Sequence, residues 1–254
     1  MKSPIGILDM GIDNISILNL VQNAFRYEHF LYVNDLECPE YEGLPIDEIL
    51  NRVKRNVAFL LSKNVKLIIV VSNTILEYCY NYFNEIRVPV INIFDIITTY
   101  LNDKYEHKNM ALLANENIMN ANIYQKKLRY NHLYSIISNK LDEIVVDNKL
   151  KTQLSFDQTK EVFKPVITKD VDIIIPTSFN LLLLTTEIAE YMRESEILPL
   201  GNLIIDKITA ALLAIENLYS KRKGKAEVFI NKKSINFNHL INKKIKVLMI
   251  DRKD

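Results

Sequence analysis

The chain has 254 residues, of which 48% are hydrophobic and 25% charged, and its formal net charge is +1. This balance excludes collagen-like, mucin-like and disordered chains, and the net charge gives no overall attraction to nucleic acid. Two cysteines are too few for a disulfide scaffold and belong to no zinc-binding pattern. No segment resembles a signal peptide or an apolar span of about 20 residues, so we expect a cytoplasmic protein without membrane contact.

Isoleucine, asparagine and lysine are unusually common, with 35 Ile, 27 Asn and 24 Lys in the chain. These types have A/T-rich codons, which indicates an AT-rich bacterial genome. Glycine numbers only 5. Loops that wrap small anions usually need glycine, so few segments could form one.

Short apolar runs recur along the chain and predict strands covered on both faces, as in parallel sheets. They are Ile5–Leu8, Phe30–Val33, Leu67–Val71, Val88–Ile93, Met110–Leu113 and Val171–Ile175. Amphipathic segments between the runs predict helices, of which the clearest are Pro45–Lys63, Asn73–Glu85 and Phe179–Arg193. Strands that alternate with helices predict βαβ units and an α/β fold.

Polar turns follow several of these strands, at the sheet edge where parallel α/β folds bind ligands. After the first strand comes Asp9-Met10-Gly11, after the third Ser72-Asn73-Thr74, and after Ile175 comes Pro176-Thr177-Ser178. Side-chain oxygens there could anchor a ligand, or they could simply cap the following helices. Local sequence leaves both interpretations open.

Six segments along the chain match, in the same order and at similar spacing, the motifs of one known protein family. Three are Ser3-Pro-Ile-Gly-Ile-Leu-Asp9-Met-Gly11, the segment from Lys66 to Ser72-Asn73-Thr74, and Ile175-Pro176-Thr177-Ser178. The other three are residues 88–93, 110–115 and 203–210. In order and spacing they resemble glutamate racemases of the aspartate/glutamate racemase superfamily, whose motifs read P-I-G-x-x-D-S-G, A-C-N-T and G-C-T-H at the first three.

The resemblance implies an α/β fold of two pseudo-symmetric lobes, each a mostly parallel sheet flanked by helices. Lobe 1 would comprise residues 1–97 and 207–254, and lobe 2 residues 98–206. A ligand would bind in a cleft between the lobes, and the family often forms homodimers.

The resemblance also implies that two catalytic cysteines are missing. Family members remove and return the α-proton with two thiols on opposite faces of the substrate, and here those positions are Ser72 and Pro176. A serine hydroxyl is too weak an acid to stand ionised without a base, and proline has no proton to exchange. The family histidine position is Ser178. Two-base racemisation should therefore be absent, and no catalytic residue is assigned.

Several family positions for holding the substrate are retained. The resemblance makes ligand-binding candidates of the retained Asp9, Tyr41, Asn73, Thr74 and Thr177, and also of Ser72, which replaces a family cysteine. The alternative interpretation of Asn73, Thr74 and Thr177 is helix capping alone.

No cofactor or metal is expected. The four histidines never share a turn, and no dinucleotide, P-loop or serine-hydrolase motif occurs. Cys79 should be a buried core thiol, while Cys38 falls in a loop among acidic neighbours that would raise its pKa.

The C-terminal strip, residues 221–254, holds 11 Lys or Arg against three acidic residues. Such a strip could contact nucleic acid or an acidic partner. It could equally consist of edge strands, at 226–230 and 245–250, whose lysines prevent unwanted pairing.

Three hypotheses of function follow. The first is a pseudoenzyme that has lost racemase activity and binds a small carboxylate, an amino acid or a protein partner. The second is an altered amino-acid racemase or isomerase that acts on glutamate, aspartate or a related carboxylate through residues other than thiols. The third is nucleic-acid or protein binding through the C-terminal strip, with nucleic acid the less favoured partner.

Overall fold

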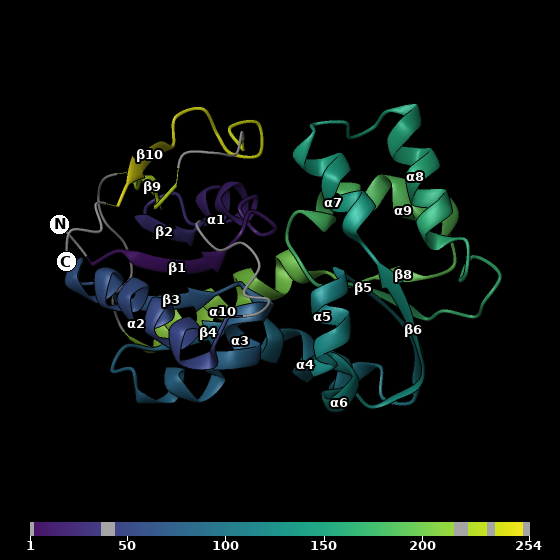
Figure 1. Ribbon diagram of the computed structural model, residues 1–254, viewed down its shortest axis with the longest axis horizontal. Coiled ribbons are helices and arrows are strands. Elements are labelled where there is room, and N and C mark those ends of the chain that lie inside the picture. The colour runs from purple at the N-terminus through teal and green to yellow at the C-terminus, as the bar shows by residue number, and fades with distance from the viewer. Residues whose placement is uncertain (1–2, 37–43, 216–222, 233–236, 251–254) are drawn as a thin grey trace. The chain divides into compact units, whose positions relative to one another are not determined.

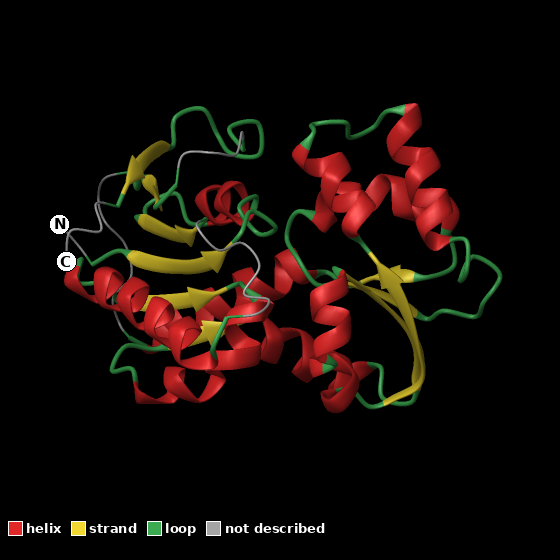
Figure 2. Ribbon diagram, in the orientation of Figure 1, coloured by secondary structure: helices red, strands yellow, loops and turns green. Residues whose placement is uncertain are grey.

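The computed structural model describes residues 3–36, 44–215, 223–232 and 237–250. The chain forms two compact units, one made of Met1–Ile93 with Asn202–Asp254 and the other of Phe94–Gly201. Figures 1 and 2 show that each unit is a sheet flanked by helices. The predicted α/β fold with two parallel sheets is therefore confirmed.

The first unit contains a six-stranded sheet in the order β10-β9-β2-β1-β3-β4, in which every pair of neighbours is parallel. Its strands are β1 (Ile5–Met10), β2 (Phe30–Asp35), β3 (Leu67–Val70), β4 (Val90–Asn92), β9 (Ala226–Ile230) and β10 (Lys246–Met249). Its helices are α1 (Ile17–Ala24), α2 (Ile46–Ser62), α3 (Asn73–Cys79) and the 3₁₀ helix η1 (Tyr80–Glu85).

The second unit contains a four-stranded parallel sheet in the order β6-β5-β7-β8. Its strands are β5 (Lys108–Ala114), β6 (Tyr130–Ile137), β7 (Ile173–Pro176) and β8 (Glu196–Ile197). Its helices are α5 (Glu116–Ala121), α6 (Ile123–Lys127), α7 (Asn139–Val146), α8 (Gln153–Phe163), the 3₁₀ helix η2 (Leu181–Leu184) and α9 (Thr185–Tyr191). Two helices lie where the units meet in sequence, α4 (Ile93–Lys104) and α10 (Leu200–Ala214).

The central strands are buried along their whole length, as their unbroken apolar sequences predict. Every residue of β1, β2 and β3 is buried. Helix α2 covers β1 with one apolar stripe, from Ile49 through Val53 and Val57 to Leu60. Gly6 permits this approach, because a Cβ at that position would lie 3.0 Å from the Leu60 methyl carbons.

Three predicted elements need correction. The segment 73–85 is not one α-helix, because α3 ends at Cys79 and continues as η1. The segment 179–193 likewise divides into η2 and α9, and the run from Val88 forms a strand only at Val90–Asn92 before α4 begins. In each case apolar periodicity predicted the element, but the backbone changes its hydrogen-bonding pattern inside the apolar segment.

In the described part of the chain, no helix is both long and apolar enough to cross a membrane.

Candidate functional site

Asp9, near the end of β1, lies in a closed polar cluster and is fully buried. The Tyr32 hydroxyl donates to one carboxylate oxygen, and the Asn14 side-chain amide donates to the other at 3.3 Å. Burial raises the pKa of Asp9 to about 7, while the Tyr32 hydrogen bond opposes this shift and the nearby Asp13 charge adds to it. Asp9 can therefore gain or lose a proton near neutral pH, as a general base or acid must.

The register of β1 and β2 creates the Asp9–Tyr32 contact. Ile7 lies opposite Tyr32 and Asp9 opposite Asn34, so Tyr32 and Asp9 point to the same face of the sheet. Burial, followed by the charge of Asp9, raises the pKa of Tyr32 well above its usual value, so Tyr32 keeps its proton and acts as a donor. Asp9 was predicted from the sequence and Tyr32 was not, because only strand pairing brings the two residues together.

The turn after β1 is shaped by Gly11, which has a φ of +83°. This left-handed conformation costs a residue with a side chain more than it costs glycine. The side-chain amide of Asn34, at the end of β2, donates to the Gly11 carbonyl. The turns after β1 and β2 are thus held together at the carboxyl edge of the sheet.

Ser72 caps α3, as one interpretation of its turn predicted. Its hydroxyl oxygen accepts a hydrogen bond from the Ile75 amide at 3.3 Å. The preceding strand lies beside β1, where the Val71 amide donates to the Leu8 carbonyl at 3.1 Å. Ser72 and Asn73 are buried and Thr74 is half-buried, at the same edge of the sheet as Asp9.

In the second unit, Pro176 is the last residue of β7, and Thr177 and Ser178 follow it; all three are buried. The Thr177 hydroxyl and the Thr177 amide each donate to the Leu113 carbonyl at 3.1 Å. The Ser178 hydroxyl accepts from the Leu181 amide at 3.4 Å. These contacts tie the turn to β5 and η2, and they occupy the hydroxyl proton of Thr177.

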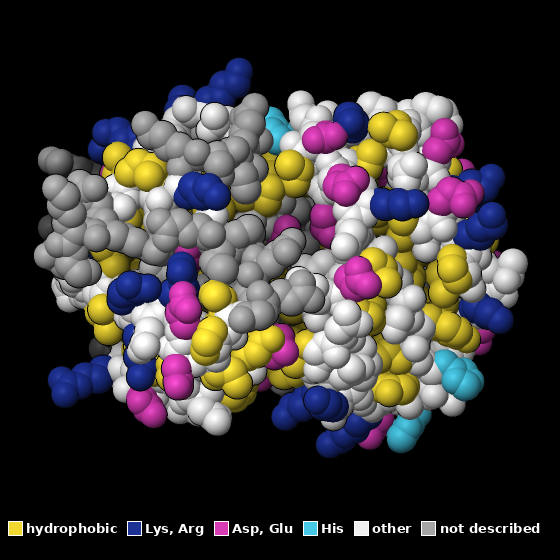
Figure 3. Space-filling view, in the orientation of Figure 1, with side chains coloured by type: hydrophobic (Ala, Val, Ile, Leu, Met, Phe, Trp, Pro, Cys, Tyr) yellow, Lys and Arg dark blue, Asp and Glu magenta, His cyan; other side chains and the backbone are white. Residues whose placement is uncertain are grey.

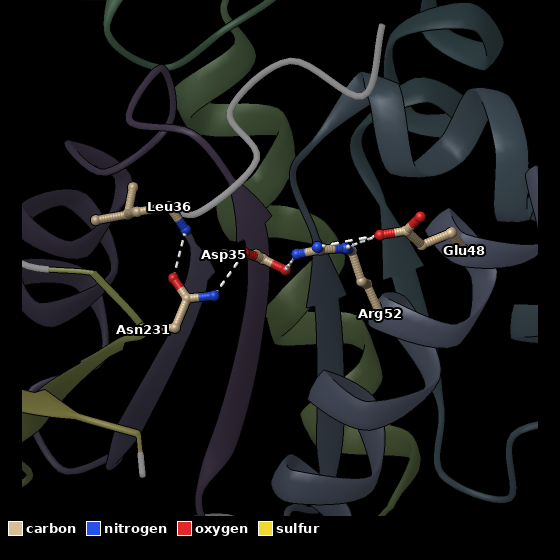
Figure 4. Close-up of polar contacts among 5 residues, drawn as sticks. All are labelled: Asp35, Leu36, Glu48, Arg52 and Asn231. Atoms are coloured by element: carbon tan, nitrogen blue, oxygen red, sulfur yellow. Dashed lines mark hydrogen bonds and ion pairs between the residues drawn. The ribbon is translucent and has the colours of Figure 1, made fainter. Parts of the chain in front are cut away.

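A second polar cluster surrounds Asp35, the last residue of β2 (Figure 4). Arg52 of α2 lies 3.5 Å from the Asp35 carboxylate and donates to Glu48 at 3.2 Å. Asn231 donates to Asp35 at 2.5 Å and accepts from the Leu36 amide at 2.7 Å. The cluster joins the end of β2 to α2 and to the residue that follows β9, so it is a structural support beside the candidate site.

Asp35→Ala is expected to lower the free energy of unfolding by about 2–3 kcal/mol, because it removes a buried charge from hydrogen-bonded partners. Glu48→Ala is the matched control, since the Glu48 side chain is 45% exposed. It should cost less than about 1 kcal/mol, as exposed ion pairs do. Urea unfolding measures both. Equal effects of the two substitutions would contradict a supporting role for Asp35.

The remaining candidates do not add to these clusters. Tyr41 and Cys38 lie outside the described residues. Cys79 is buried as predicted, and burial raises the pKa of its thiol to about 11, only partly offset by the charge of Lys54. Across the described ranges, no three His, Cys, Asp or Glu side chains gather as metal ligands.

Known proteins resemble this chain in sequence and in fold. No family model matches the chain. Glutamate racemase of Lactobacillus acidophilus is 25% identical over 200 residues, which cover 76% of this chain and 74% of the relative.

Two solved structures share the fold over nearly the whole chain. Glutamate racemase of Thermus thermophilus, in complex with β-chloro-D-alanine, has a TM-score of 0.86 at 17% identity and covers 99% of this chain and 98% of its own. The Francisella tularensis enzyme, in complex with D-glutamate, has a TM-score of 0.83 at 16% identity and covers 98% of each chain. The sequence relatives and the shared fold thus support the resemblance of this chain to the aspartate/glutamate racemase superfamily.

Proposed function

We propose that this chain is a glutamate-racemase-like protein that no longer racemises and instead binds a small amino acid or carboxylate. The proposal rests on the residues found at the two positions where the family has thiols, Ser72 and Pro176. The Ser72 hydroxyl oxygen accepts from the helix it caps, and Pro176 ends β7 with no exchangeable proton. Neither position supplies a base for one face of an α-carbon and an acid for the other.

Binding of a small carboxylate is supported by the polar groups kept at the sheet edges. Asp9, Asn73 and Thr74 remain at the end of the first sheet, and Thr177 remains at the end of β7. The Francisella tularensis relative was crystallised in complex with D-glutamate. A dicarboxylic amino acid is therefore the first ligand to test.

In deuterated buffer, wild-type protein is expected to leave the α-proton of L- and D-glutamate, and of both aspartates, at the rate found without protein. Proton NMR follows the α-proton signal, and saturation-transfer difference in the same samples reports binding. Exchange with any enantiomer would contradict the loss of activity, whereas absence of binding to all four would contradict the ligand class. Ser72→Cys/Pro176→Cys, which restores both thiols, is the informative variant: exchange should rise above the wild-type rate if a glutamate-like ligand still binds.

A second candidate is an altered isomerase in which Asp9 is the base. The buried carboxyl with a pKa of about 7 favours it, because such a group is near its optimum for proton transfer at neutral pH. If Asp9 is the base, the α-proton of one enantiomer should exchange with solvent. The rate of this exchange should rise as the pH increases through about 7, and Asp9→Asn should abolish it. A rate that Asp9→Asn leaves unchanged would exclude Asp9 as the base.

A further inference from the structure

Strand β10 forms one edge of the six-stranded sheet, with β9 as its neighbour in the described sheet. All four of its residues are exposed. Val247, Leu248 and Met249 are 37%, 38% and 45% exposed. Figure 3 shows hydrophobic side chains at the surface where Figure 1 places β10, with Lys or Arg side chains close by. An uncovered apolar edge strand is a template for pairing with another chain.

The backbone of β10 offers specific hydrogen-bonding groups at this edge. The Ile250 amide, directly after the strand, donates to the Ile230 carbonyl at 2.8 Å. Backbone groups of successive strand residues point to opposite sides, so Leu248 faces β9 as Ile250 does. The N–H and C=O groups of Val247 and Met249 therefore point outward, away from β9.

The surroundings of this edge are basic. Lys243, Lys244 and Lys246 are exposed directly before and at the start of β10, and Lys225 is exposed directly before β9. Because β9 and β10 are parallel and Lys246 lies opposite Glu227, these lysines gather at the same end of the strand pair. A second copy of this chain would bring further lysines to the interface, whereas an acidic segment would neutralise those present.

We propose that the outward edge of β10 binds an extended acidic segment of a partner protein. The segment adds to the sheet as a further strand: its backbone pairs with Val247 and Met249, its apolar side chains cover those of β10, and its carboxylates lie near the lysines. This interaction surface is independent of the ligand proposed above, since it uses none of the residues after β1, β3 or β7.

The test uses the full chain and a synthetic ten-residue peptide that alternates glutamate with valine. Val247→Pro removes the outward N–H and leaves the β9 ladder intact, because proline is tolerated at an edge position whose N–H faces away from the sheet. Val247→Thr is the matched control, which keeps the N–H and the β-branched shape. Isothermal titration calorimetry is expected to give at least about tenfold weaker binding for Val247→Pro and little change for Val247→Thr, since each 1.4 kcal/mol lost weakens binding tenfold.

Four further arms complete the experiment. Met249→Pro removes the second outward N–H and should also weaken binding of the acidic peptide. Lys244→Glu/Lys246→Glu should weaken binding of this peptide as well. A peptide with lysine in place of glutamate should bind far more weakly than the acidic one. Amide chemical-shift changes in labelled protein should centre on β10.

Several results would overturn the proposal. These are no binding of the acidic peptide at millimolar concentration, equal binding of the lysine peptide, or wild-type affinity in both proline variants. A concentration-dependent dimer that Val247→Pro abolishes would assign the edge to a second copy. Binding of a single-stranded oligonucleotide that survives Val247→Pro but not the lysine substitutions would assign the strip to nucleic acid.

Discussion

Asp9→Asn is expected to raise the free energy of unfolding by about 4 kcal/mol at pH 8, yet to change it little near pH 4. The reason is that burial lifts the pKa of Asp9 from 3.8 to about 7 in the folded chain. An asparagine of the same shape can accept the Tyr32 hydrogen bond without ever carrying a charge. Urea unfolding of both proteins at several pH values measures the difference.

The direction follows from proton binding in the two states. Below pH 3.8 the carboxyl is protonated whether the chain is folded or not. Between 3.8 and about 7 the unfolded chain loses this proton while the folded chain keeps it, so the contribution of Asp9 to stability falls as pH rises. Above about pH 7 both states are ionised, and the whole contribution has been lost.

Asp103→Asn, on the exposed face of α4, controls for the loss of one negative charge. The gain in the free energy of unfolding from Asp9→Asn should grow with pH, whereas the effect of Asp103→Asn should not depend on pH in this way. An advantage of constant size from pH 4 to pH 9 would mean that Asp9 is not held protonated in the folded chain.

Lys66→Met is expected to lower the free energy of unfolding by about 3–5 kcal/mol, because it leaves the buried carboxylate of Glu28 without its cation. The Lys66 ammonium lies 2.6 Å from Glu28, and the two side chains are only 4% and 6% exposed. Few groups in the described chain combine opposite charges with such complete burial. Urea unfolding at neutral pH provides the measurement.

The double variant Glu28→Leu/Lys66→Met separates the worth of the pair from the cost of a lone charge. Replacing both partners by apolar residues should recover most of the stability, since desolvation of a buried pair nearly cancels its attraction. If the double variant is as unstable as Lys66→Met, packing rather than the unpaired charge explains the loss.

The central strands could be predicted closely from the sequence, and for a clear reason. Strands covered on both faces need unbroken apolar runs, and β1, β2 and β3 begin at the predicted residues 5, 30 and 67. Strand β6 was not predicted, because its residues Tyr130–Ile137 lie at a sheet edge and five of the eight side chains are polar or aromatic. An edge strand that is partly exposed carries no continuous apolar signal.

The candidate site could be predicted only where its residues share a turn. Ser72-Asn73-Thr74 and Pro176-Thr177-Ser178 each follow an apolar run directly, so the sequence placed them at the ends of strands. Tyr32 lies 23 positions from Asp9 in the chain, and Asn231 lies 196 positions from Asp35. No local pattern predicts contacts at such separations.

The amino-acid sequence by itself determined the α/β class, the order of the main strands, the superfamily resemblance and the absence of cysteine at positions 72 and 176. Each of these depends on residue type and on spacing along the chain. Only the tertiary structure decided that burial raises the pKa of Asp9 to about 7, that the Thr177 hydroxyl donates to the Leu113 carbonyl, and that the apolar side chains of the edge strand β10 are exposed. The physical reason is that burial, strand register and hydrogen-bond partners come from segments far apart in sequence, which meet only when the sheets form.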